Sequence, residues 1–212
     1  MYFDTLVDVS SLPARRTRAE QQEATRLALL DAAIELFVEQ GVEATSIEDV
    51  TRRAGFSRGA FYSNFDSKHD LFLETSRRFL DRLHAAAAPP ADEPAPPAGT
   101  AYAERLARMQ AQVGEGAAVF LAELSLYSIR HPELLEETAQ LHQDQLVPAM
   151  AFVRARLDDA GIGTPRVPIE TLANIAQSLT FGLGLMGRID PEVDPEAFVA
   201  AGMDLIMKGL TA

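Results

Sequence analysis

Apolar residues recur at helical spacing through most of the chain, and this pattern predicts an all-α protein. The spacing is clear in segment 17–40, where apolar residues three or four positions apart form one face: Leu27, Leu30, Ile34 and Phe37. Gly41 follows and marks the end of this helix. The sequence contains no strand-like alternation, internal repeat or heptad run. We therefore expect about nine helices.

Glycine and proline residues divide the remainder of the chain into further helices. The expected helical segments are 47–54, 58–65, 67–88, 102–113, 117–130, 132–160, 168–188 and 195–210. Pro148 lies inside one of them and should kink it, because proline removes a backbone donor. Residues 89–99 hold five prolines and are expected to form a loop or flexible spacer. We interpret residues 1–16 as a disordered or flexible lead.

The most informative stretch is segment 46–68, which begins with a short helix ended by a glycine. Ser46 is placed to cap this helix, because its hydroxyl can accept from free backbone N–H groups of the first turn. Three apolar residues share one face: Ile47, Val50 and Ala54. Gly55 can then adopt the left-handed C-cap conformation without penalty. A second short helix follows at once, so the segment has the form of a helix-turn-helix.

The second short helix has an outer face of small and polar residues. Ser57 is placed to cap it and Phe56 to plug the turn, while Phe61 and Phe65 can face inward. The outer face then consists of Arg58, Gly59, Ala60, Tyr62, Ser63 and Asn64. Small residues allow close approach to another surface, and the polar side chains carry donors for phosphates and base edges. This face is typical of a DNA-reading helix.

In this stretch the sequence resembles the tetracycline-repressor (TetR) family of bacterial transcriptional regulators. The matching residues are Thr45-Ser46, Ala54-Gly55-Phe56-Ser57, Gly59-Ala60-Phe61-Tyr62, Asn64-Phe65, Ser67-Lys68 and Leu71. Two positions depart from the family pattern. Thr51 stands where the family usually has alanine, and Glu48 stands where a neutral or basic residue is frequent. Because Glu48 close to DNA would be repulsive, it leaves the register of the first short helix on the DNA backbone open.

The resemblance implies a DNA-binding domain over residues 17–66 and a C-terminal ligand-binding and dimerisation domain over residues 67–212, joined by the fourth helix. It also implies which side chains meet DNA. Phosphate contacts are expected from Ser57, Tyr62, Asn64 and Lys68, and base-facing positions are Arg58, Gly59, Ala60 and Ser63. Ser46, at the start of the first short helix, is included in the interface.

The C-terminal helices are expected to hold a cavity for a small, largely apolar effector, as the resemblance implies. The candidate lining residues are Met109, Phe120, Leu124, Tyr127, Met150 and Phe181. Polar contacts to a ligand could come from Tyr127, Gln145, Gln177 or Ser178. For most apolar residues of these helices, an ordinary core role remains the alternative.

The last two predicted helices carry small residues and are apolar on more than one face. By resemblance they form a four-helix interface with a second subunit, through Ala173, Ala176, Leu179, Leu183, Gly184, Gly187, Phe198 and Ala201. Purely internal packing is the alternative. Residues 182–187 also spell the dinucleotide fingerprint G-x-G-x-x-G. We reject that interpretation, because the fingerprint must follow a strand and open a helix.

The charge is unevenly distributed along the chain. The formal net charge is −12, yet residues 13–84 hold 11 Lys and Arg against 12 Asp and Glu. Local basic patches, rather than net charge, mark a nucleic-acid interface. Candidates for such a patch are Arg15, Arg16, Arg18, Arg26, Arg52, Arg53, Arg58 and Lys68. An acidic body with one basic end would also steer that end toward DNA.

Composition argues against several other classes of protein. The chain has no cysteine, which excludes disulfides and thiolate zinc sites. The four histidines share no ligand spacing, no catalytic pattern stands out, and we expect neither a metal nor another cofactor. No basic n-region precedes an apolar stretch, and no apolar run approaches the roughly 18 residues that a transmembrane helix needs. A cytoplasmic protein is expected.

These observations predict a DNA-binding regulator rather than an enzyme. The expected partners are a palindromic double-stranded operator, a second copy of the chain and a small hydrophobic effector that releases a repressor from DNA. A helical-bundle enzyme or a scaffold protein without DNA binding is the alternative.

Overall fold

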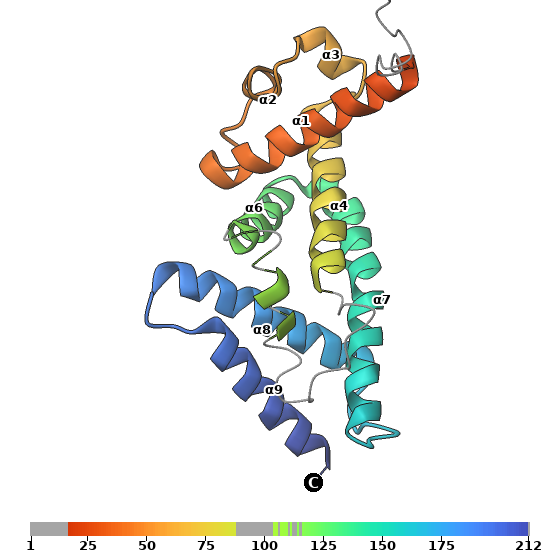
Figure 1. The fold of residues 1–212 in the computed structure, drawn as a ribbon, viewed down its shortest axis with the longest axis vertical. Helices are drawn as coiled ribbons and strands as arrows, with labels where there is room; N and C mark the ends of the chain where they lie inside the picture. The colour runs from red at the N-terminus through yellow and green to blue at the C-terminus, as the bar shows by residue number, and fades with distance from the viewer. Residues whose placement is uncertain are drawn as a thin grey trace, which may run out of the picture.

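The computed structural model describes residues 17–87 and 116–211, together with residues 104, 105, 107–109, 111 and 114. The predicted lead, residues 1–16, and the proline-rich segment, residues 89–99, lie outside the described residues. The described part contains eight α-helices and one short 3-10 helix and no strand, so the all-α prediction is confirmed. Figure 1 shows a small helical head at one end of an elongated helical body.

The head consists of α1 (Arg18–Gln40), α2 (Ile47–Ala54) and α3 (Arg58–Tyr62). These bounds agree closely with the predicted segments, except that α3 ends three residues early. Thr17 caps α1 and forms a reciprocal capping box with Glu20. Gly41 ends α1 with φ of 86°, in the positive region that glycine tolerates. Helices α2 and α3 both pack against α1, which supports the helix-turn-helix pair.

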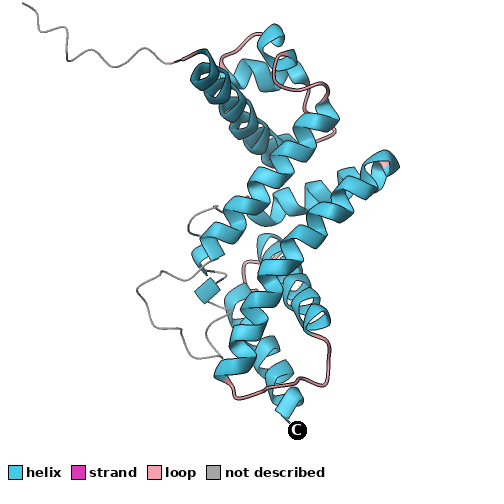
Figure 2. Ribbon diagram, turned by 90° about the vertical axis from the view of Figure 1, so that its right-hand side faces the viewer, coloured by secondary structure: helices cyan, strands magenta, loops and turns pink. Residues whose placement is uncertain are grey.

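The body begins with α4 (Lys68–Ala87), which leaves the head and packs against α1 and α7 (Figure 1). The described residues between 104 and 111 are helical, as predicted for segment 102–113. After them come α6 (Ala117–Arg130), the 3-10 helix η2 (Pro132–Leu134) and α7 (Leu135–Asp159), which continues through Pro148. The last pair, α8 (Ile169–Ile189) and α9 (Pro195–Thr211), lies at the end distant from the head, where Figure 2 shows the C-terminus. Helix α8 also packs against α6 and α7.

None of the described helices is both long and apolar enough to cross a membrane.

A single aromatic core joins the head to the body. Phe120 of α6 stacks on Phe79 of α4, with ring centroids 4.1 Å apart, and lies 6.3 Å from Phe37 of α1. Phe72 of α4 in turn contacts Phe37 and Tyr127, at 6.5 and 4.7 Å. Each such buried aromatic stabilises the fold by roughly 1.5–3 kcal/mol relative to exposure. Helix α4 is therefore not the sole connection, because α1 also packs directly on α6.

One hydrogen bond and one close backbone approach reinforce this junction. The Glu123 carboxylate of α6 accepts a hydrogen bond from the backbone N–H of Val42, with Oε2 to N at 2.9 Å. Gly116, at the start of α6, lies so close to Val38 of α1 that an added Cβ would meet Cγ1 at 2.9 Å. A larger residue at position 116 would thus push the two helices apart.

Small residues in α8 serve packing within one chain. Ala173 and Ala176 are buried, and a Cβ on Gly184 would lie 3.6 Å from Ala118 of α6. A Cβ on Gly187 would lie only 2.6 Å from Pro195, at the start of α9. Ala173 and Ala176 therefore pack inside one chain, whereas Gly184 and Gly187 are half-buried, and their assignment to a subunit interface stays a prediction. Residues 182–187, which spell the G-x-G-x-x-G pattern, lie inside α8 and do not follow a strand. This position agrees with the rejection of a dinucleotide-binding role.

Candidate nucleic-acid interface

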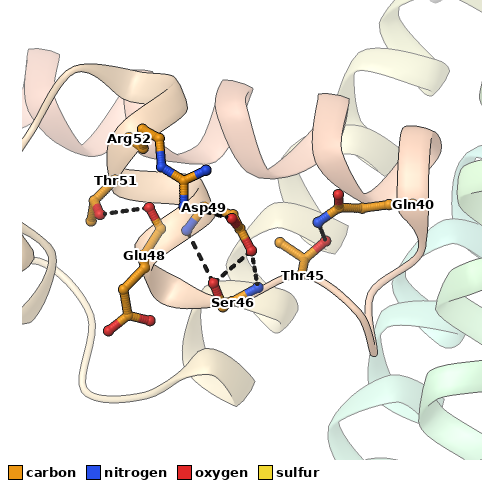
Figure 3. Close-up of polar contacts among 7 residues, drawn as sticks. All are labelled: Gln40, Thr45, Ser46, Glu48, Asp49, Thr51 and Arg52. Atoms are coloured by element: carbon orange, nitrogen blue, oxygen red, sulfur yellow. Dashed lines mark hydrogen bonds and ion pairs between the residues drawn. The ribbon is translucent and has the colours of Figure 1, made fainter.

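The start of α2 is fixed by a reciprocal capping box (Figure 3). Ser46 Oγ accepts from the backbone N–H of Asp49 at 3.1 Å, and Asp49 Oδ2 accepts from the Ser46 backbone N–H at 3.1 Å and its hydroxyl at 2.6 Å. These bonds, the Ser46 hydroxyl first, lower the pKa of Asp49. Asp49 Oδ1 also binds Arg52 at 2.8 Å. Ser46 is half-buried and its hydroxyl already serves the cap.

The turn between α2 and α3 depends on one left-handed residue. Gly55 has φ of 76° and ψ of 27°, the left-handed conformation predicted for it. Ser57 then caps α3, accepting from the N–H of Ala60 at 3.2 Å. Phe56 does not plug the turn, since 38% of it is exposed. The core role falls instead to Phe61 and Phe65, which are buried as predicted.

Burial of these two phenylalanines points the other side of α3 outward. Four of the predicted DNA-facing residues are exposed on this surface: Arg58, Gly59, Tyr62 and Ser63. Ala60 and Asn64 are half-buried, and Asn64 Nδ2 donates to the Ala60 carbonyl at 2.7 Å. Helix α1 supports this end of the segment, because Arg26 Nη1 donates to the Asn64 carbonyl at 3.1 Å.

Arg58 is held in place by residues one turn away and on α2. Its Nη1 lies 2.7 Å from Glu48 Oε1, and its Nη2 donates to the Tyr62 hydroxyl at 3.3 Å. The guanidinium also lies over the Tyr62 ring, 5.6 Å from the centroid. The Tyr62 hydrogen bond and the Glu48 charge both raise the pKa of Arg58. Glu48, unusual for the family, therefore has a definite partner in the free protein.

Lys68 differs from the other predicted phosphate contacts, because it points to the body. Its Nζ donates to the Glu43 carbonyl at 3.0 Å and lies 5.7 Å from the Tyr127 ring centroid. Burial lowers the pKa of this ammonium group. In this arrangement Lys68 links the α1–α2 turn to α6.

Several basic residues of the expected patch are engaged in ion pairs within the protein. Arg53 binds Glu39 and Glu35 of α1, at 2.6 and 3.1 Å. Arg26 binds Glu74 of α4 at 2.9 Å. The Arg53 ion pairs join α2 to α1 within the head, and the Arg26 ion pair joins α1 to α4. Among the described residues of the expected patch, Arg26 and Lys68 are half-buried, and the exposed ones are Arg18, Arg52, Arg53 and Arg58. Arg15 and Arg16 lie outside the described residues.

The body contains a cavity of about 800 Å³ between α4, α6, α7 and α8. Three of the predicted ligand residues line it: Met109, Leu124 and Phe181. Its polar lining includes three residues that the sequence suggested as polar contacts to a ligand: Gln145, Gln177 and Ser178. The buried Gln145 Oε1 accepts no well-formed hydrogen bond from the described residues. Burial, together with the charge of Arg105, lowers the pKa of the lining residue His84.

Three residues expected at the cavity do not line it. Phe120 is 1% exposed and lies in the aromatic core that joins head and body. Tyr127 packs between Phe72 and His131, and burial raises its pKa to about 12. Met150 packs against a separate apolar cluster formed by α7 and α8. The sequence could not separate these positions, because core and cavity residues on one helix have the same apolar character.

Helices α8 and α9 expose several large apolar side chains, here called the apolar stripe, which overlap only in part with the predicted interface residues. The stripe consists of Ile175, Met186, Ile189, Phe198 and Leu205, each between 38% and 71% exposed. Residues 175, 179, 182, 186 and 189 follow helical spacing on one face of α8. Among the predicted residues, Phe198 and Ala201 are exposed, and Leu179 and Leu183 are half-buried.

The sequence of the head matches known bacterial transcriptional regulators. The family model described as bacterial regulatory proteins, tetR family, matches residues 29–75. The regulator AcrR of Shigella flexneri is 49% identical over 61 residues, which are 29% of this chain and 28% of AcrR. TtgR of Pseudomonas putida is 40% identical over 70 residues, 33% of this chain and 31% of TtgR. The chain thus matches less than a third of the length of these relatives.

Solved structures extend the likeness beyond the head. PfmR, a TetR-family regulator from Thermus thermophilus, is 27% identical with a TM-score of 0.58, covering 86% of this chain and 98% of its own. A putative TetR-family regulator from Rhodococcus has a TM-score of 0.70 at 18% identity, covering 87% of this chain and 99% of its own. The resemblance to the TetR family is therefore confirmed, closely for the head and in fold for most of the chain. These relatives are named as regulators and not as enzymes.

Proposed function

We propose that this chain is a TetR-type transcriptional regulator that binds double-stranded DNA through α3. The observation that carries the proposal is the outward face of α3, where Arg58, Tyr62 and Ser63 are exposed beside Gly59 on a capped, rigid helix pair. The family match over residues 29–75 covers this same segment. Such a regulator would act in the cytoplasm.

A mobility-shift assay with DNA from upstream of its own gene tests this proposal. Binding that is lost on competition with the same DNA, but not with unrelated DNA, supports a sequence-specific regulator. Absence of any DNA binding by the folded chain would favour the alternative, a helical scaffold or enzyme.

We further propose that the chain acts as a homodimer on a palindromic operator. The supporting observation is the apolar stripe of α8 and α9, which leaves Phe198 55% and Leu205 71% exposed. Two copies meeting through this stripe would bury it, and the two heads would then face two half-sites, as dimeric helix-turn-helix proteins do.

Leu205→Glu should convert the protein to a monomer at micromolar concentration. A symmetric interface would place the carboxylate against apolar surface twice, and burial of an unpaired charge is costly. Light scattering measures the mass, and circular dichroism checks that the helices persist. Val147→Glu is the matched control, because Val147 of α7 is 68% exposed and lies outside the stripe. A dimer that survives Leu205→Glu would contradict this interface.

We also propose that the body cavity receives a small, largely apolar effector that releases the repressor from DNA. A volume of about 800 Å³ lies within the range of small-molecule sites, and the lining is mostly apolar with a few polar groups. A ligand releases DNA only to the extent that it prefers the non-binding conformation. A ten- to hundredfold loss of operator affinity needs about 1.4–2.7 kcal/mol of such preference.

Ser125→Trp should weaken effector binding at least about tenfold while operator binding persists. Ser125 is an exposed residue of the cavity lining, so an indole there occupies the space without disturbing the core. The measurement is release of fluorescent operator DNA by a panel of hydrophobic compounds. Leu126→Trp is the matched control, because the adjacent Leu126 is exposed but does not line the cavity. Equal responses from both variants would place the effector elsewhere.

A further inference from the structure

Two histidines and two glutamates from distant parts of the sequence meet where the head joins the body. Glu43 lies in the turn between α1 and α2, and His69 in the first turn of α4. His131 lies between α6 and η2, and Glu133 lies in η2. One donor atom each from His69, His131 and Glu133 lies within 4.8 Å of the others. The sequence offered no local ligand spacing here, because the fold alone brings these residues together.

His131 has a carboxylate on each side of its ring. Its Nε2 lies 3.2 Å from Glu43 Oε2, and its Nδ1 lies 3.1 Å from Glu133 Oε1. A neutral imidazole carries only one N–H, so it can donate to only one of these carboxylates. The other nitrogen then directs a lone pair toward a negative group. A cation between that nitrogen and the carboxylate resolves this conflict.

A proton on His131 is one such cation, and both glutamates favour it. A proton on His131 would serve Glu43 and Glu133 but would not engage the third member of the cluster, His69, whose ring packs edge to face on Tyr127 with centroids 5.9 Å apart. The His69 Nδ1 lies 3.9 Å from the same Glu133 oxygen, and the two imidazole rings meet edge to face with centroids 5.0 Å apart.

We propose that His69, His131 and Glu133 bind a divalent transition-metal ion of the Zn²⁺ type, with water completing the coordination. Two imidazoles and one carboxylate form a ligand set that zinc accepts at about 2.0–2.2 Å per bond. A tetrahedral ion with these bond lengths separates its ligand atoms by about 3.4 Å. The distances of 3.1 and 3.9 Å to Glu133 Oε1 lie on either side of this value. Both Glu133 distances are thus within about 0.5 Å of the tetrahedral spacing, and the ligand atoms of the two imidazoles lie within 4.8 Å of each other.

Glu43 would act as the partner that orients His131. With Nδ1 bound to the metal, Nε2–H donates to the Glu43 carboxylate, which fixes the tautomer and raises the basicity of the ligand. Carboxylate–histidine–zinc arrangements of this kind are general in zinc proteins. The Glu43 carbonyl is itself held by Lys68, at 3.0 Å. The side chains of His69 and His131 are 38% and 23% exposed, so an ion can enter from solvent.

The metal would join α4 to the α6–η2 junction directly, and the His131–Glu43 hydrogen bond would extend this link to the head, to which Glu43 belongs. This consequence rests on the proposed DNA-binding function, whereas metal binding itself does not. An ion that fixes the position of α4 relative to α6 should change operator affinity by about fivefold or more. By linkage, operator DNA should change the Zn²⁺ affinity by the same factor.

Isothermal titration of the tag-free, chelator-treated full chain with Zn²⁺ tests the site. We expect one Zn²⁺ per chain with micromolar or tighter affinity, and at least about tenfold weaker binding in His69→Gln and in Glu133→Gln. Glu43→Gln should weaken binding about 10- to 100-fold although it removes no ligand. His142→Gln is the matched control, because His142 pairs with Asn174 at 3.2 Å and lies outside the cluster.

The absence of stoichiometric Zn²⁺ binding would overturn the proposal, as would unchanged affinity in both His69→Gln and Glu133→Gln. Circular dichroism shows that each variant is folded. Anisotropy with operator DNA, with and without saturating Zn²⁺, then tests the coupling. Unchanged operator affinity would overturn the regulatory role alone. Failure to bind any DNA would contradict the proposed function and leave the Zn²⁺ titration unaffected.

Discussion

Arg58→Ala should weaken operator binding by about 1–3 kcal/mol per half-site and relax base preference at one position in each. A dimer presents two copies of α3, so the loss doubles to about 2–6 kcal/mol, or roughly 30-fold or more in Kd. The structure adds a reason to expect a base contact here. Arg58 lies in the exposed first turn of α3, and its hydrogen bond to the Tyr62 hydroxyl helps to set its orientation.

Glu48 provides an internal comparison for this measurement. In the free protein the Arg58 guanidinium lies 2.7 Å from the Glu48 carboxylate. To contact a base, it must leave Glu48 or bind Glu48 and the base at the same time. Glu48→Gln removes the competing charge and a source of repulsion toward phosphates, so operator binding should be unchanged or tighter. Arg154→Ala on α7 removes one positive charge from the body and serves as the matched control. Anisotropy titrations with the operator and with single-base variants would measure all three. Arg58→Ala binding like wild type would mean that α3 does not read the DNA.

The helix-turn-helix was predictable from sequence because its signals are local. Capping by Ser46 and Ser57, the left-handed Gly55 and the inward pair of phenylalanines all act over one or two helical turns. Helix ends in the body were equally readable, since glycine and proline mark them. Local signals therefore account for the element order and most helix bounds.

The residue roles in the body were harder to predict, because they depend on which helices meet. Ala173 has the small size that a subunit interface would need, yet it is fully buried inside one chain. Phe120 has the character of a cavity residue but lies in the core. The pairing of His69 with His131 needs the return of α6 beside α4, which no local pattern encodes.

Phe120→Ala should destabilise the protein by about 3–5 kcal/mol, a large part of the stability of a domain of this size. Phe120 is 1% exposed, stacks on Phe79 at 4.1 Å and contacts Phe37 of the head. Truncation leaves a cavity at the point where α1, α4 and α6 converge, and the surrounding rings cannot all collapse into it. Urea unfolding followed by circular dichroism measures the change. Leu126→Ala is the control, since Leu126 lies on the same helix and is 46% exposed.

The same variant separates a core role from an effector-contacting role. A core residue shared by head and body should lower the unfolding midpoint and weaken operator binding, because the head loses its support on α6. An effector contact would instead leave both stability and operator binding intact and reduce only release by the ligand. Since the cavity lining includes Leu124 and not Phe120, we expect the first pattern. A Phe120→Ala protein that is as stable as wild type but insensitive to effector would show that the cavity extends into the aromatic core.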